Sequence, residues 1–207
     1  MSQSKPNRRS VLKSLFVLPW SVALIWPARA AVRTPAATEG PFYPTPGMRF
    51  KDADNDLVRI NGVAGEARGE IIALRGRVLD RSGKPVDGAR IEIWQCDANG
   101  RYLHGGDSRR RRRDPSFQGF GHVVTDASGD YAFRTIKPVP YPGRAPHIHV
   151  KIFAGSAVLT TQFYLAGHPQ NERDWLYRRM NSAQRKSVEM TFSRRGKWPE
   201  TIVDVVV

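Results

Sequence analysis

Short segments of alternating apolar and polar residues, separated by turns, dominate the chain from residue 71 onward. The clearest is 89–95, where Ala89, Ile91 and Ile93 share one face and the intervening residues share the other. Strands of this kind are also predicted over 72–80, 147–153, 159–165, 187–192 and 201–207. Many short strands at even spacing, with Gly and Pro between them, predict an all-β fold, a β-sandwich.

The remaining segments have other patterns. Residues 123–125 and 131–136 flank the turn sequence 126–130 and predict a hairpin. Residues 31–56 are rich in Pro, Gly and Asp and predict an irregular N-terminal arm, whereas 170–182 predict one short helix. Four prolines within 138–146 exclude the interior of a hydrogen-bonded strand there.

Composition agrees with a single globular domain, predicted over residues 31–207. The 207 residues are 40% apolar and 25% charged, with a formal net charge of +14. The run Arg109–Arg113 contributes five positive charges, but no aromatic residues interleave it to stack on bases, so we expect a solvated loop and no nucleic acid partner. The single cysteine, Cys96, excludes an internal disulfide and predicts a small buried apolar group.

Residues 1–30 have the pattern of an export signal. Arg8 and Arg9 precede an apolar stretch over 15–26, and Ala28-Arg29-Ala30 follows as a cleavage site. This order predicts a twin-arginine signal peptide and a protein that is periplasmic or secreted. The apolar stretch is short for a membrane span, so we expect no stable membrane insertion after cleavage; the alternative is a retained anchor.

His147-Ile148-His149 is the sharpest chemical feature. Residues i and i+2 of a strand point to the same face, so both imidazoles project together and could bind one metal ion. Two histidines on one strand face are more often ordinary surface or hydrogen-bonded residues. Here, however, the pair follows a Pro-rich loop that contains Tyr141 and Arg144.

A second feature is the sequence from Trp94 to Tyr102. A strand ends there, turns through Asn99-Gly100 and delivers Tyr102 at the exit of the turn. Taken by itself, Tyr102 is an ordinary half-buried tyrosine.

Together these segments resemble the intradiol ring-cleavage dioxygenases, most closely the protocatechuate 3,4-dioxygenase-like chains. The resembling pieces run in order across most of the chain: residues 38–44, 76–89, 91–102, 129–138, 141–144, 147–149 and 161–164. Several motifs in register are more specific than any one of them.

The resemblance implies a mononuclear iron(III) centre. Tyr102, Tyr141, His147 and His149 match the family's metal ligands, with Tyr141 as the tyrosine that leaves the metal when substrate binds. Arg144 matches an arginine that lies over the substrate, and Gln162 matches a supporting glutamine. The implied reaction uses O2 to open a catechol-type ring between its two hydroxylated carbons, giving a muconate-type diacid.

The residue types suit this chemistry. A phenolate is a hard anionic oxygen donor that favours iron(III), and no carboxylate neighbours the histidine pair as in the two-His-one-carboxylate oxygenases. The stretch from Tyr141 to Arg144 is short, which leaves the preferred catechol open, and the sequence does not distinguish a homo-oligomer from a pairing with a second chain.

Two other functions are compatible with parts of the sequence. Residues 76–94 also resemble the non-catalytic β-sandwich modules of transthyretin-like and carboxypeptidase-associated domains. That reading leaves Tyr102, Tyr141, Arg144 and the histidines without a role. An exported copper or zinc protein would use the His147/His149 pair but neither tyrosine.

Overall fold

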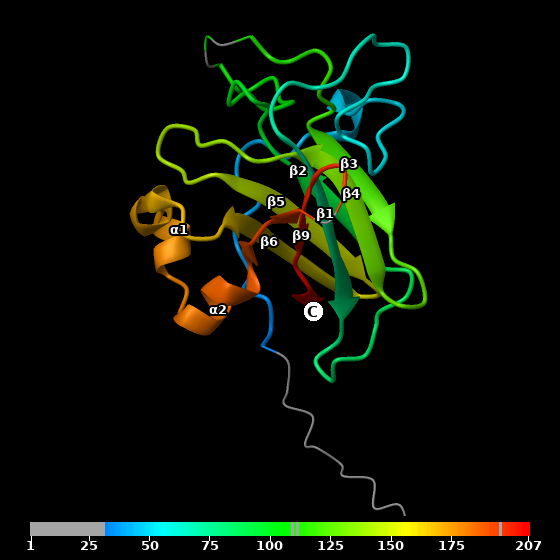
Figure 1. Ribbon diagram of the computed structural model, residues 1–207. Helices are drawn as coiled ribbons and strands as arrows, with labels where there is room; N and C mark the ends of the chain where they lie inside the picture. The colour runs from blue at the N-terminus through cyan, green and yellow to red at the C-terminus, as the bar shows by residue number, and fades with distance from the viewer. Residues whose placement is uncertain (1–31, 109, 111, 195) are drawn as a thin grey trace, which may run out of the picture.

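The computed structural model describes residues 32–108, 110, 112–194 and 196–207, which form two β-sheets packed face to face (Figure 1). The predicted all-β sandwich is therefore confirmed. The predicted signal peptide, residues 1–30, lies outside the described residues. No helix in the described part of the chain is long and apolar enough to cross a membrane.

The first sheet is built around β1 (Ile71–Leu79). Strand β1 pairs antiparallel with β4 (Asp130–Ile136) and parallel with both β9 (Pro199–Ile202) and β10 (Val205–Val206). Strand β8 (Ser193–Arg194) pairs with β9 and continues the sheet on that side. The second sheet has the order β3 (Phe120–Val124), β2 (Arg90–Trp94), β5 (His147–Ala154), β6 (Ala157–Leu165) and β7 (Glu189–Met190).

The main core lies between the two sheets, because alternate residues of each strand face inward. Leu74 and Ile72 from β1 meet Ile91, Ile93 and Ile148 from the second sheet, and all five are fully buried. Burying each such side chain contributes about 1.5 to 3 kcal/mol.

The opposite face of β2 and β5 is also buried, because the N-terminal arm covers it. The arm is irregular as predicted, apart from the short 3-10 turn η1 (Pro46–Met48). Its Tyr43 donates a hydrogen bond of 2.5 Å to the buried carboxylate of Glu92, and its Glu39 pairs with Lys151 at 2.5 Å. These contacts place Phe42 and Tyr43 against Trp94 and Tyr102 in a second apolar cluster.

The predicted hairpin over 123–136 is wrong. Both strands exist, but β3 pairs with β2 and β4 pairs with β1, so the turn carries the chain from one sheet to the other. Asp126 closes that turn by accepting hydrogen bonds from the backbone amides of Ser128 and Asp130. Such a turn serves a hairpin and a corner between sheets equally well, so the local sequence does not separate the two.

The prediction of one helix over 170–182 is also wrong in detail. The structure has three short pieces: η2 (Pro169–Arg173), α1 (Trp175–Arg178) and α2 (Ser182–Ser187), which lie beside β6 (Figure 1). Asp174 and Asn181 interrupt the helix because each caps a new N-terminus with its side chain. The predicted strand 187–192 is accordingly reduced to β7.

The closing strand predicted over 201–207 is split into β9 and β10. The interruption lies at Val203, whose carbonyl accepts a 2.6 Å hydrogen bond from the Tyr131 hydroxyl. The Val203 carbonyl also lies against Gly76, where a β-carbon would come within 1.9 Å of its oxygen. A side chain larger than hydrogen therefore cannot occupy position 76 without moving the backbone.

Candidate metal centre

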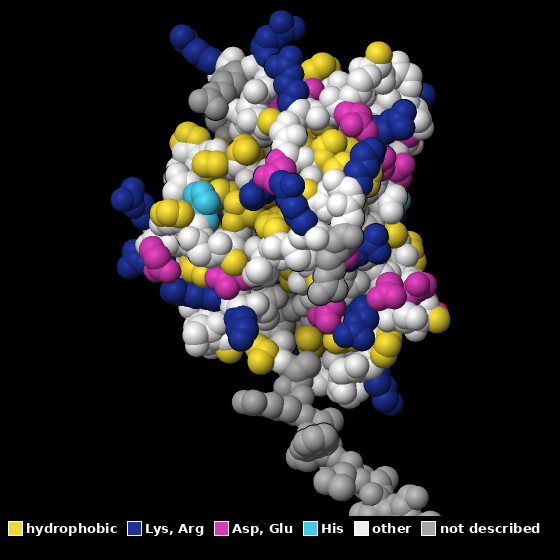
Figure 2. All heavy atoms as spheres, viewed as in Figure 1, with side chains coloured by type: hydrophobic (Ala, Val, Ile, Leu, Met, Phe, Trp, Pro, Cys, Tyr) yellow, Lys and Arg dark blue, Asp and Glu magenta, His cyan; other side chains and the backbone are white. Residues whose placement is uncertain are grey.

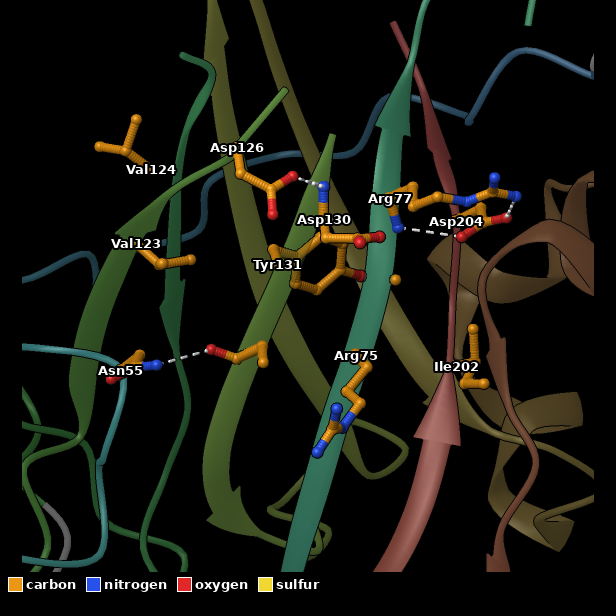
Figure 3. Close-up of a pocket in the computed structure, with 12 residues that line it drawn as sticks. Asn55, Arg75, Arg77, Val123, Val124, Asp126, Asp130, Tyr131, Ile202 and Asp204 are labelled. Carbon is orange, nitrogen blue, oxygen red and sulfur yellow. Dashed lines mark hydrogen bonds and ion pairs between the residues drawn. The ribbon is translucent and has the colours of Figure 1, made fainter. Parts of the chain in front are cut away.

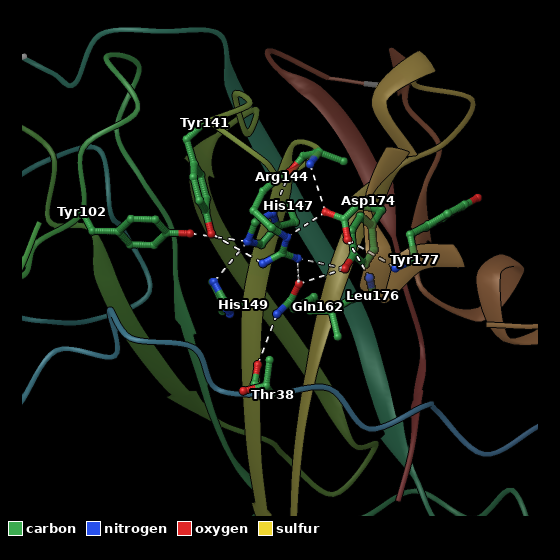
Figure 4. A network of polar contacts seen from close by, with 12 residues as sticks. Thr38, Tyr102, Tyr141, Arg144, His147, His149, Gln162, Asp174, Leu176 and Tyr177 are labelled. Carbon is green, nitrogen blue, oxygen red and sulfur yellow. Dashed lines mark hydrogen bonds and ion pairs between the residues drawn. The ribbon is translucent and has the colours of Figure 1, made fainter. Parts of the chain in front are cut away.

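The structure brings all six predicted site residues together at one end of the second sheet (Figure 4). His147 and His149 begin β5 and point to the face that the arm covers, and Gln162 lies opposite His149 on β6. Tyr102 comes from the loop after β2, while Tyr141 and Arg144 come from the loop before β5.

The histidines face each other closely. Their Nε2 atoms are 3.1 Å apart, and the Tyr102 hydroxyl lies 3.5 Å from the Nε2 atom of His147. The Tyr141 ring contacts the rings of His147 and Tyr102, with centroid distances of 5.4 Å and 5.6 Å, respectively. Two nitrogen donors and two phenol rings thus converge in one buried cluster.

The orientation of each imidazole is fixed from behind. The Nδ1 atom of His147 is 2.6 Å from the carbonyl oxygen of Ala145, so Nδ1 carries the proton and Nε2 presents a lone pair to the cluster. The His149 ring stacks on Trp94 at 4.7 Å between centroids with a 10° interplanar angle. The Nδ1 atom of His149 is buried and has no hydrogen-bond partner among the described residues.

Burial sets the protonation of these groups. It lowers the pKa of His147 to about 3, with the nearby Arg144 charge as the second cause, and it lowers the pKa of His149 well below its usual value. It also raises the pKa of Tyr102 well above that of a free phenol and raises the pKa of Tyr141. The imidazoles are therefore neutral, as metal ligands must be, and the phenols ionise only beside a strong cation.

These residues fit a bound iron(III) ion. The two Nε2 atoms are 3.1 Å apart and present their nitrogens to the same point, close enough for one ion to contact both. In the described part of the chain, no group of three or more His, Cys, Asp and Glu side chains is placed to hold a metal. The Tyr102 hydroxyl and the Tyr141 ring lie against the histidines, and their hard phenolate oxygens would suit the ferric ion.

Arg144 is the hub of a polar network beside the histidines (Figure 4). Its Nη2 atom donates to Gln162 Oε1 at 2.5 Å and to the Tyr164 hydroxyl at 3.2 Å, and its Nη1 atom lies 3.5 Å from the Tyr141 hydroxyl. Gln162 in turn donates to the carbonyl oxygen of Thr38 in the arm. The guanidinium charge is therefore held next to Tyr141.

Three residues that the sequence did not single out complete the centre. Phe42 of the arm stacks on Tyr102 at 4.9 Å, Trp94 supports His149, and Tyr164 shares the oxygen of Gln162 with Arg144. All three lie in segments that carry the family resemblance, 38–44, 91–102 and 161–164, which is the signal that could have identified them. Cys96 is buried in the same cluster, as predicted.

A cavity of about 480 Å³ opens on the outer side of Tyr141. Its walls include Pro140, Pro142 and Gly143, and Arg110 lies at its rim as an exposed side chain. Arg112 is also exposed, whereas Arg113 is half-buried and donates to the carbonyl oxygen of Phe117. The other two arginines of the predicted solvated run lie outside the described residues.

Another cavity, of about 640 Å³, lies on the first sheet and contains none of the predicted site residues (Figure 3). The side chains there are already engaged with one another: Arg77 pairs with Asp204 at 3.1 Å, and Asn55 donates to the carbonyl oxygen of Ala132. Lys and Arg side chains are spread over the visible face of the molecule among Asp and Glu (Figure 2).

Comparison with known proteins gives a consistent result. A family model described as "Dioxygenase" matches residues 38–204. The protocatechuate 3,4-dioxygenase beta chain of Burkholderia cepacia is 40% identical over 149 residues, which are 68% of this chain and 63% of that protein. Hydroxyquinol 1,2-dioxygenase of Corynebacterium glutamicum is 34% identical over 159 residues, 67% of this chain and 48% of that protein. The chain thus spans about half to two thirds of the length of these relatives.

Solved structures support the same fold. The dioxygenase domain of a dioxygenase carbohydrate-binding protein fusion from Streptomyces sp. SirexAA-E has a TM-score of 0.64 and 32% identity, covering 84% of this chain and 97% of that one. An intradiol ring-cleavage dioxygenase from Tetranychus urticae has a TM-score of 0.65 over 84% of this chain and 93% of that one, at 24% identity.

Proposed function

Because the chain belongs to the intradiol ring-cleavage dioxygenase family, we propose that it uses O2 to cleave a catechol-type ring between its two hydroxylated carbons, giving a muconate-type diacid. The observation that carries the proposal is the convergence of Tyr102, Tyr141, His147 and His149 in one buried cluster. All four residues lie within the segment that the family model matches.

In this proposal the same four side chains hold an iron(III) ion. The ion would supply Lewis acidity and accept electron density from a bound catecholate. His147 and His149 contribute neutral nitrogen donors whose orientation is fixed by Ala145 and Trp94. The transthyretin-like module and the copper or zinc protein are disfavoured because each leaves the two tyrosines without a role.

Tyr141 is the ligand best placed to leave and take up a proton. It is more exposed than Tyr102 and borders the 480 Å³ cavity, so an entering catechol would reach it first. Burial raises the pKa of Tyr141 above that of a free phenol, so its released phenolate oxygen is basic enough to accept a catechol proton.

Arg144 supplies positive charge next to the reacting atoms. Its Nη1 atom faces the Tyr141 hydroxyl, and Gln162 and Tyr164 fix the other end of the guanidinium group. Negative charge that develops on a substrate oxygen near Tyr141 would be stabilised there, a contact of about 3 kcal/mol in a dry site. Phe42 and Trp94 add apolar surface to the centre by packing against Tyr102 and His149.

The deciding experiment is spectroscopic. Protein produced with iron should absorb visible light through tyrosinate-to-iron(III) charge transfer, catechol should shift the band, and O2 should be consumed in equal amount with the diacid formed. Tyr102→Phe should alter the band. Tyr131→Phe is the matched control, because Tyr131 is an equally buried tyrosine on the first sheet. A colourless, iron-free protein would refute the proposal.

We also propose that residues 1–30 direct export by the twin-arginine route. The support is the order of Arg8-Arg9, the apolar stretch and Ala28-Arg29-Ala30. That route carries folded cargo, which suits a protein that takes up its metal before export. Replacing both Arg8 and Arg9 by Lys in the full chain should retain the protein in the cytoplasm, and unchanged export would contradict the assignment.

A further inference from the structure

A buried carboxylate outside the predicted site contacts the site from behind. Asp174 stands at the junction of η2 and α1, and its side chain is 0% exposed. A buried carboxylate is costly unless each of its oxygens is satisfied by hydrogen bonds or a partner charge. The contacts of Asp174 therefore indicate what its charge is for.

Each carboxylate oxygen of Asp174 accepts two hydrogen bonds. Oδ1 accepts from the backbone amides of Leu176 at 3.0 Å and Tyr177 at 3.3 Å, which caps α1. Oδ2 accepts from the Nε atom of Arg144 at 2.8 Å and from the backbone amide of Ala145 at 3.0 Å. Oδ1 thus stabilises the start of α1, whereas Oδ2 contacts residues of the candidate centre.

The ion pair determines which edge of the guanidinium group faces the centre. Because Asp174 occupies Nε of Arg144, the Nη1 and Nη2 atoms are left to meet Tyr141, Gln162 and Tyr164 (Figure 4). An arginine side chain has several rotatable bonds, so a partner at Nε restrains the direction in which the guanidinium group points.

The second Oδ2 contact reaches the histidine pair. The amide of Ala145 donates to Asp174, and the carbonyl of the same residue accepts from Nδ1 of His147. Asp174 therefore holds the residue that fixes the ring orientation of His147.

We infer that Asp174 is a positioning residue of the centre, acting through Arg144 directly and through Ala145 on His147. The inference rests on the proposed function for its kinetic consequence. Its structural content, that the carboxylate of Asp174 aims the guanidinium group, is testable without turnover.

The kinetic test is Asp174→Asn in the iron-loaded protein. The amide oxygen can still cap α1, but an NH2 group then opposes the Nε and amide donors of Arg144 and Ala145. We expect kcat to fall about 10- to 100-fold with a smaller change in KM, the size seen for residues that orient metal-site side chains. Asn181→Ala is the matched control, since it removes the side-chain cap of α2 and should leave kcat within about twofold.

A double-mutant cycle separates positioning from general damage. Part of the Asp174→Asn loss acts through Arg144 and the rest through Ala145, so adding Asp174→Asn to Arg144→Gln should lower kcat/KM by less than Asp174→Asn does alone. If the kcat/KM losses of the two single variants multiply in full in the double variant, the inference is overturned. Asp174→Ser, a smaller capping residue that also lacks the carboxylate, should reproduce the loss if Asp174→Asn does not fold.

A measurement without iron keeps the inference distinct from the proposed function. In metal-free protein labelled with nitrogen-15 arginine, the Nε–H signal lost in Arg144→Lys identifies Arg144. This proton should exchange slowly in the unsubstituted chain and in Asn181→Ala, and rapidly in Asp174→Asn. Unchanged exchange in Asp174→Asn would refute the positioning role even if the protein cleaves catechols. Rapid exchange with no ring cleavage by the unsubstituted protein would support it and reject only the proposed function.

Discussion

Mild acid should destabilise the metal-free fold, because His147 and His149 are buried in their neutral form. Burial lowers the pKa of His147 to about 3, whereas an unfolded histidine has a pKa of about 6.5. Above about pH 6.5 neither state binds the proton, so the histidines contribute no pH dependence there. Below it the unfolded chain takes up protons that the folded chain does not, and the free energy of unfolding falls.

The magnitude follows from the two pKa values. Well below the unfolded pKa, the free energy of unfolding falls by about 1.4 kcal/mol per pH unit for each such histidine. Between about pH 7 and about pH 5.5, His147 therefore removes about 1.3 kcal/mol. His149, whose pKa is also strongly lowered by burial, removes a similar amount, which makes about 2.5 kcal/mol for the pair.

Urea unfolding of the metal-free protein at the two pH values measures this loss. We expect the midpoint to fall by about 1 M or more, given typical urea dependences of about 1 to 3 kcal/mol per molar. His147→Gln should roughly halve the response. His168→Gln should not, because His168 lies at the start of η2, away from the buried cluster. A midpoint that does not move between the two pH values would refute the reasoning.

Three further changes have defined outcomes. Gly76→Ala should cost about 3 kcal/mol or more in urea unfolding, because its β-carbon would lie 1.9 Å from the carbonyl oxygen of Val203; Gly47→Ala, with open space around it, should be near neutral. Trp94→Ala should lower the free energy of unfolding by about 3 to 5 kcal/mol and weaken iron binding, because Trp94 is buried and stacks on His149. Trp94→Phe should lower it less, because the buried Nε1 atom of Trp94 has no hydrogen-bond partner among the described residues to lose. Removing iron with a chelator should lower the melting temperature and bleach the visible band, and a melting temperature independent of iron would contradict the proposed ligand set.

Strand positions were predictable because they depend on local alternation. The period of two over 89–95 located β2 and assigned Ile91 and Ile93 to the core. The same rule placed His147 and His149 on one face of β5. Which strands pair with each other was harder to predict, because the choice of sheet depends on contacts with residues far along the chain. The wrong hairpin over 123–136 is the example.

The candidate site was predictable only in part. Strand geometry brings the histidines together. The positions of Tyr102 and Tyr141, however, depend on two loops whose conformation the local sequence pattern does not predict, so these two residues were identified from the family resemblance alone. The burial of Trp94 on the face opposite Ile91 and Ile93 likewise depends on the arm, which has no periodic signal. Asp174 was missed because a capping aspartate has the same local sequence whether or not it also binds an arginine.

The attachment of the arm has a consequence for the order of assembly. Thr34 bonds to Val206 in both directions, its amide to the Val206 carbonyl and its hydroxyl oxygen to the Val206 amide, so the arm is fastened by a strand 172 positions later. Phe42, which covers Tyr102, follows this anchor by eight residues. During synthesis, the arm cannot dock at this anchor until β10 has left the ribosome. The contacts of Tyr43 with Glu92 and of Glu39 with Lys151 do not need β10, so the arm closes over the candidate metal centre in two stages, and the Thr34 attachment forms last.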